Sequence, residues 1–114
     1  MIDRQKFNDN FQYFDKEIII EIIDIFFSEY EERYKNLQQN IQDKDFTKLK
    51  FNAHSLKGVI ANFMDPVSIE HSRKLDEMAR NMQEAGIDQL FADLKKSSAD
   101  LVKELEQLKK ELTS

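Results

Sequence analysis

The sequence contains no cysteine, and its 114 residues include only two glycines and one proline. The absence of cysteine excludes disulfides, thiolate metal sites and cysteine nucleophiles. With so few turn-forming residues, a fold rich in β-hairpins is not expected. Gly58 and Gly86 lie far apart in the chain, so there is no glycine-rich loop of the kind that binds phosphate. These absences favour a helical protein.

Long hydrophobic segments and an excess of basic residues are also missing. The longest apolar stretch, residues 18–27, is interrupted by Glu21 and Asp24 and is too short to cross a bilayer. The N-terminal segment Met1-Ile2-Asp3 lacks the features of a signal peptide. A net charge of −5 gives no electrostatic attraction to nucleic acid or to an anionic membrane. We therefore expect one cytoplasmic domain over residues 1–114 that binds neither nucleic acid nor a membrane.

Apolar side chains that recur every three or four residues, together with capping residues, predict one short helix and four long ones. The short helix covers about residues 3–13, and the first long helix runs to about Gln42. The residues expected to cap the starts of the four long helices are, in order, Asp15, either Asp43 or Asp45, Asp65 (which precedes Pro66), and Asp88. The helix that begins after Asp65 is expected to end at Gly86.

Each long helix carries an apolar stripe, which in the first and last of them consists of Ile19, Ile23, Phe26, Tyr30, Tyr34, Leu37 and Ile41, and of Phe91, Leu94, Ser98, Leu101, Leu105, Leu108 and Leu112. Four such helices joined by short loops predict an all-α fold, an antiparallel up-down-up-down four-helix bundle with the short N-terminal helix across one end. A long antiparallel coiled coil is the alternative, but it does not explain the many aromatic residues in the first half of the chain.

His54 lies in the middle of the second long helix and has unusual neighbours. At about 100° per residue, His54 lies roughly 130° from the centre of the core stripe, so it is expected to be at least half exposed. Lys57 and Gly58 follow three and four residues later, at the positions that a helix brings beside His54. Lys50 and Ala61 occupy the next turns on the same side. The imidazole would thus have an ammonium group on one side and no side chain on the other.

Gly58 and the local charge both point to a function for His54. Glycine inside a helix costs about 1 kcal/mol relative to alanine, and either close helix packing or access to His54 would explain it. Residues 46–64 contain three lysines and no acidic residue, although the chain as a whole is acidic. Such a positive field would stabilise a group that carries about two negative charges. A neutral imidazole is also a competent nucleophile, so the pattern predicts a histidine that carries a phosphoryl group.

Other site chemistry has little support in the sequence. His54 and His71 fall on different predicted helices, and neither has a glutamate three or four residues away, so no metal site is predicted. No spacing argues for a catalytic serine–histidine–acid set. We expect His71 to be a surface or boundary residue.

The motif Ala53-His54-Ser55-Leu56-Lys57-Gly58, followed by Ala61-Asn62, is similar to the signature of histidine-containing phosphotransfer (HPt) domains. Residues 72–78, Ser-Arg-Lys-Leu-Asp-Glu-Met, resemble the pattern on the following helix of that family. The chain departs from the family at residues 63–66, where a leucine–glycine turn is common, and at Val59 and Ile60, which replace small residues. These departures concern the local loop shape rather than the histidine.

The resemblance implies that His54 is phosphorylated, that Lys57 steadies the phosphoryl group and that Gly58 leaves room for a partner's active site. The protein would relay phosphate between receiver-domain aspartates, or from a hybrid sensor histidine kinase to a response regulator, in a two-component phosphorelay. It would not be an enzyme with autokinase activity, because Ser55 stands where sensor kinases have an acidic residue and there is no ATP-binding segment. No cofactor is expected on this chain, since the receiver domain would supply Mg²⁺.

Docking of a receiver domain requires an apolar patch near His54. The expected docking residues are Phe51, Lys50, Ser55, Ala61, Ile20 and Phe27. Packing of the short first helix would explain Ile20 and Phe27 equally well. We expect a monomer. The alternative function is a non-catalytic helical interaction module in which His54 is incidental, but this would not explain Lys57 and Gly58 beside an exposed histidine.

Overall fold

The computed structural model describes residues 1–114 and consists of five α-helices with no β-strand. The helices are α1 (Arg4–Asn10), α2 (Lys16–Gln42), α3 (Phe46–Ala61), α4 (Pro66–Arg80) and α5 (Ile87–Thr113). The predicted all-α class is therefore confirmed, as is the division into one short helix and four long ones.

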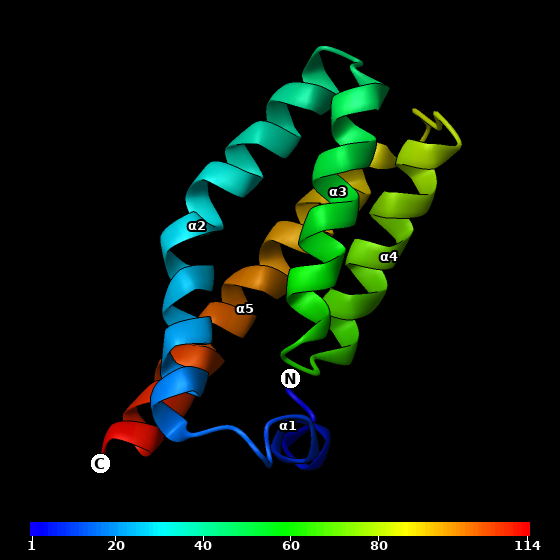
Figure 1. Cartoon of the computed structure of the whole chain (residues 1–114). Helices are drawn as coiled ribbons and strands as arrows, with labels where there is room; N and C mark the ends of the chain where they lie inside the picture. Colours follow the sequence, from blue (N-terminus) through cyan, green and yellow to red (C-terminus); the bar gives the residue numbers. More distant parts are fainter.

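The four long helices contact one another in a ring. α2 packs against α3, α3 against α4, α4 against α5, and α5 against α2. Figure 1 shows the loops after α2 and α4 at one end of this bundle, and the loop after α3 at the other end, where α1 also lies. α1 is tied to that loop because the amide of Asn10 donates a hydrogen bond to the carbonyl of Asn62 at 3.2 Å. The backbone N–H of Asp3 donates to the carbonyl of Met64 at 2.8 Å.

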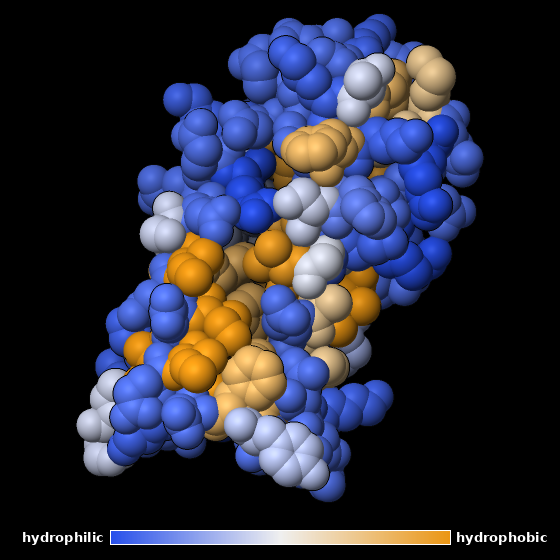
Figure 2. Space-filling view, viewed as in Figure 1, coloured by the Kyte–Doolittle hydropathy of each residue, from blue (hydrophilic) through white to orange (hydrophobic).

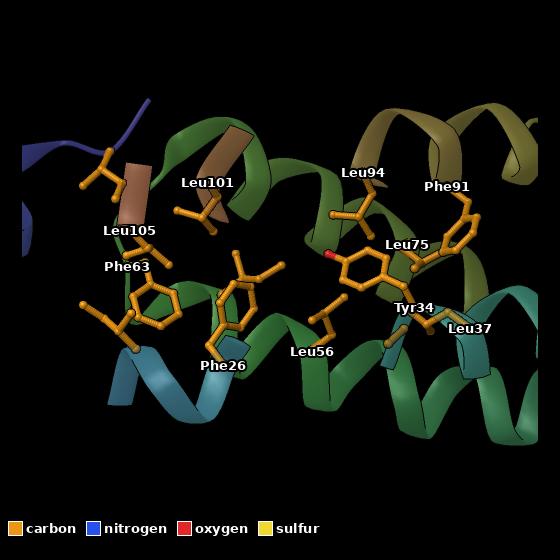
Figure 3. Close-up of a cluster of buried hydrophobic side chains, with 14 of the residues drawn as sticks. Phe26, Tyr34, Leu37, Leu56, Phe63, Leu75, Phe91, Leu94, Leu101 and Leu105 are labelled. Carbon is orange, nitrogen blue, oxygen red and sulfur yellow. The ribbon is translucent and has the colours of Figure 1, made fainter. Parts of the chain in front are cut away.

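The core forms one cluster along the bundle axis, to which all four long helices contribute (Figure 3). On α2, Phe26 packs against Phe63 with ring centroids 5.1 Å apart. Tyr34 reaches across the bundle, and its hydroxyl forms a hydrogen bond with Ser98 of α5. Burial of the phenol raises the pKa of Tyr34 above its ordinary value. Most residues of the two predicted stripes are buried, whereas Tyr30, Ile41 and Leu112 are half-buried against the core.

The starts of α3 and α4 follow the expected capping residues. The side chain of Asp45 accepts a hydrogen bond from the backbone N–H of Lys48 at 3.1 Å, so Asp45 rather than Asp43 caps α3. The side chain of Asp65 accepts from the N–H of Val67 at 3.3 Å, with Pro66 in the first turn of α4. Asp15 occupies the N-cap of α2 but makes no capping hydrogen bond with its side chain. Local sequence rules therefore place these helix starts correctly.

The end of α4 and the start of α5 differ from the expectation. α4 ends at Arg80 rather than at Gly86, because Met82 adopts a left-handed conformation with φ of 52°. The N–H of Gln83 then donates to the carbonyl of Met78 at 2.9 Å, which closes the helix in a Schellman motif. Gly86, with φ of 81°, is instead the N-cap of α5, and Asp88 lies in the first turn. The predicted end of α4 was wrong because it assumed that a glycine would adopt the left-handed conformation that ends the helix.

Met82→Gly is expected to stabilise the protein. A left-handed conformation costs a non-glycine residue roughly 1 kcal/mol, and the Met82 side chain is 67% exposed, so little packing is lost. The free energy of unfolding in urea should rise by about 0.5 to 1 kcal/mol. Gly86→Ala is the matched control and should lower that free energy by a similar amount. A decrease for Met82→Gly would contradict this explanation of the end of α4.

Candidate functional site

His54 lies in the middle of α3, and its side chain is 72% exposed. The buried residues of α3 are Leu49, Ala53, Leu56 and Ile60, which occupy the opposite side of the helix. The exposure expected from the helical spacing is therefore confirmed. An imidazole so placed is open to a partner protein in solvent.

A buried carboxylate from α4 lies beside His54. Asp76 is only 1% exposed, and its Oδ1 is 3.7 Å from Nδ1 of His54. The other oxygen, Oδ2, accepts a hydrogen bond from Lys57 Nζ at 2.9 Å and lies 3.3 Å from Nη2 of Arg80. Oδ1 has no hydrogen-bond partner, which leaves it free to accept a hydrogen bond from a protonated Nδ1 after a small movement of the ring.

The charge of Asp76 is maintained by its neighbours. Burial raises the pKa of Asp76, but the hydrogen bond from Lys57 and the charges of Lys57, Arg80 and His54 outweigh it and bring the pKa below its ordinary value. The carboxylate is therefore ionised at neutral pH. It favours a proton on Nδ1 of His54, so Nε2, at the opposite edge of the ring, is the nitrogen that remains available as a nucleophile.

Asp76 is the site residue that sequence reasoning missed. It belongs to the family-like segment 72–78, which was the available signal, but nothing in the sequence shows that this position faces His54. The lysines and the lack of acids in α3 suggested a purely positive surrounding. The structure corrects this, because α4 contributes a carboxylate that pairs with Lys57. The site thus combines one buried carboxylate with the cationic side chains of Lys57 and Arg80 beside the imidazole.

Asp76→Asn is expected to lower the free energy of unfolding by about 1 to 2 kcal/mol at pH 7, because Lys57 and Arg80 lose a buried carboxylate. A carboxyl whose pKa is lowered by folding stabilises the native state above its unfolded pKa, and this contribution disappears as the pH falls through the folded pKa. The difference between the wild type and Asp76→Asn should therefore shrink below about pH 4.

Urea unfolding at several pH values tests this expectation. Glu77→Gln is the matched control, since Glu77 is an exposed acid on the same helix whose partner is Arg73. This exposed pair should contribute less than about 1 kcal/mol. An equal loss for Asp76→Asn at every pH would show that the charge of Asp76 is not responsible.

Gly58 lies on an open part of α3. A Cβ atom added to this residue would meet no heavy atom within 4 Å, so close helix packing does not explain the glycine. Ala61 and Lys50 are exposed on the same helix. The surface beside Gly58 is therefore open, and a partner can approach the imidazole closely there.

Phe51 and Ser55 lie on the other flank of His54, toward α2. Phe51 is 74% exposed, as expected for a docking residue. Ser55 is half-buried, and its hydroxyl accepts a hydrogen bond from Nη1 of Arg33 at 3.0 Å. The same guanidinium donates from Nη2 to Glu29 at 3.1 Å. Arg33 thus links α2 directly to the residue that follows His54.

The structure does not bring Ile20 and Phe27 together with His54. Both are half-buried, and Phe27 packs against the core. Asp24, which shares their side of α2, forms an ion pair with Lys109 of α5 at 2.6 Å. This side of α2 therefore turns toward α5, whereas Arg33 marks the side that turns toward α3. Sequence spacing could not distinguish them, because α2 is apolar on more than one side.

The exposed apolar surface of α2 lies elsewhere. Ile18 and Ile25 are exposed and Ile22 is half-buried, all on the side of α2 that helical spacing aligns with Arg33. Figure 2 shows apolar surface over the N-terminal half of α2, next to α3. We call Ile18, Ile22 and Ile25 the isoleucine patch. The sequence analysis did not assign these three residues to the docking surface.

His71 lies apart from this site. It is half-buried between α4 and α5, and its Nδ1 is 2.9 Å from the hydroxyl of Ser97. This agrees with the expected boundary position. No group of three or more histidine, aspartate or glutamate side chains is arranged to hold a metal ion. None of the helices combines the length and the apolar character needed to span a bilayer.

Comparison with known families identifies the chain. The family model described as the Hpt domain matches residues 21–113. Because this match covers most of the chain, the protein belongs to the Hpt domain family. Hpt domains are phosphoryl carriers of phosphorelays and interact with receiver domains and kinases of two-component systems. Searches of curated proteins and of solved structures found no significant match.

Proposed function

We propose that His54 is the residue that carries the phosphoryl group. In this proposal the protein relays phosphate between receiver-domain aspartates, or from a hybrid sensor histidine kinase to a response regulator, and has no autokinase activity. The observation that carries the proposal is the placement of an exposed imidazole whose Nδ1 faces the buried carboxylate of Asp76. Gly58 leaves the approach to this ring open.

The geometry suggests how transfer would proceed. Nε2 of His54 attacks the phosphorus of the partner's acyl phosphate, the bond from phosphorus to the aspartate oxygen breaks, and the aspartate leaves as a carboxylate. The proton on Nδ1 remains toward Asp76, whose charge balances the positive charge of the phosphorylated ring. Lys57 steadies the phosphoryl group. The receiver domain would supply Mg²⁺ and most of the transition-state stabilisation, so this chain needs no cofactor.

The docking surface in this proposal surrounds His54 on α3 and continues onto α2. On α3 it comprises Phe51, Lys50, Ser55, Gly58 and Ala61. On α2 we assign its apolar part to the isoleucine patch instead of Ile20 and Phe27, because the patch lies on the side that faces α3. An apolar centre of this kind is what a transient protein interface requires.

Incubation with the phosphorylated receiver domains of the source organism tests the proposed function. We expect at least one receiver to transfer acid-labile phosphate, with a ³¹P signal of phosphohistidine substituted at Nε2. ATP alone should give no label. A non-catalytic interaction module would bind a receiver without acquiring phosphate, which would refute the proposal. Phosphate on Nδ1 would contradict the role assigned to Asp76.

We also propose that residues 1–114 form a single monomeric domain that acts in the cytoplasm, with antiparallel up-down-up-down topology. The ring of contacts among the four long helices and the short loops between them support this topology. Light scattering of the purified protein tests the monomer, and a dimer mass would refute it.

A further inference from the structure

A polar groove runs between α2 and α3 beside His54. We call it the α2–α3 groove, and it is lined by Ser28, Glu29, Glu32, Arg33 and Asn36 of α2 and by Phe51, Asn52 and Ser55 of α3. Phe51 is its only hydrophobic residue. Ser55 directly follows His54 in the chain, so any partner that covers the imidazole also comes close to this groove.

Internal hydrogen bonds hold the walls of the groove. Arg33 is bonded both to Glu29 of its own helix and to Ser55 of α3. Asn52 donates to Oδ1 of Asn40 at 2.7 Å. Because these side chains already have partners, the groove keeps its shape without a ligand, and little conformational entropy would be lost on binding.

Glu32 is the free charge of the groove. The Glu29 carboxylate is neutralised by Arg33 at 3.1 Å, whereas Glu32 is exposed and has no cationic partner. On the opposite flank of His54 the side chains of Lys57 and Arg80 surround Asp76, and Lys50 is exposed nearby on α3. His54 therefore lies between a basic flank and an acidic one.

We propose that the α2–α3 groove selects receiver domains by charge and shape. The receiver it accepts places a lysine or arginine beside Glu32 and an apolar side chain on Phe51. This inference rests on the proposed function, because it assumes that a receiver docks over His54. The acidic, phosphate-bearing active site of the receiver is attracted to the basic flank, so an adjacent part of its surface must cover the acidic groove. A receiver with an acidic residue at that point is repelled.

Transfer kinetics of Glu32→Lys test the proposal. The probe is the phosphorylated receiver domain that transfers fastest to the wild-type protein. We expect the KM for this receiver to rise about tenfold with kcat little changed, since a rim charge acts on association. Phe51→Ala should raise the KM by a similar factor, because an exposed aromatic residue is a typical interface anchor. Circular dichroism should show unchanged helicity for both variants.

Glu31→Lys provides a matched control. It makes the same change of charge at the next residue of α2, and Glu31 is exposed but does not line the groove. Its KM should stay within about twofold of the wild type at moderate salt. Exchanging the receiver's contacting lysine or arginine for glutamate should restore transfer to Glu32→Lys.

The outcomes separate this inference from the proposed function. Equal effects of Glu31→Lys and Glu32→Lys would show that only the overall charge matters and would overturn the selection by the groove. An unchanged KM in Glu32→Lys, or a change confined to kcat, would overturn it too. If the wild-type protein accepts phosphate from no receiver, the proposed function itself fails. Wild-type transfer with a KM that rises for Glu32→Lys but not for Glu31→Lys supports both.

Discussion

Replacement of His54 by glutamine is expected to abolish phosphate uptake from every receiver domain. Glutamine has no nucleophilic nitrogen, so the acyl phosphate of the receiver cannot be attacked. The side chain is 72% exposed, and the free energy of unfolding should therefore change by less than about 0.5 kcal/mol. Acid-labile phosphate on the protein, measured after incubation with a phosphorylated receiver, is the direct readout.

The chain offers a matched control for this experiment. His71 is the only other histidine, and its Nδ1 is occupied by the hydroxyl of Ser97. His71→Gln should retain phosphate uptake, although the lost contact between α4 and α5 will reduce stability by about 1 kcal/mol. Persistent labelling of His54→Gln would refute the assignment of His54 as the phosphorylated residue. Loss of labelling in both variants would show instead that uptake depends on the integrity of the bundle.

Gly58→Glu is expected to reduce the transfer rate at least about a hundredfold without unfolding the protein, a loss comparable to that of a misplaced reacting group. Nothing lies within 4 Å of a Cβ at this position, so the added side chain extends into the space through which the receiver reaches His54. Its charge also repels the acidic active site of the receiver. Replacing a glycine inside a helix should meanwhile stabilise the fold by roughly 0.5 to 1 kcal/mol.

The variants Gly58→Ala and Gly58→Gln distinguish the effect of side-chain size on the transfer rate from the effect of charge. Alanine adds one methyl group and should slow transfer only slightly, while it stabilises the helix to a similar degree. Glutamine matches the size of glutamate without its charge, so it should retain most of the loss if the obstruction is steric. Single-turnover rates with one receiver give the comparison. A normal rate for Gly58→Glu would remove the argument that this glycine provides access.

The sequence by itself determined those features that depend on one helix. The caps Asp45 and Asp65 act within a few residues of their own position, so local rules located them. The exposure of His54 follows from the spacing of the apolar residues of α3. The neighbours Lys57 and Gly58 share its helix, and the family match over residues 21–113 agrees with the motif that contains them. The all-α class follows from the same periodicity.

Only the tertiary structure decided which side chains from other helices lie beside these residues. Asp76 is 22 residues from His54 in the chain, and its place beside the imidazole depends on the packing of α4 against α3. The link from Arg33 to Ser55 depends in the same way on α2 and α3. Because α2 is apolar on several sides, the proposal of the isoleucine patch in place of Ile20 and Phe27 required the orientation of the helix. The charges around His54 are therefore a property of the packed bundle, since a periodic pattern specifies which side of a helix is buried but not which partner covers it.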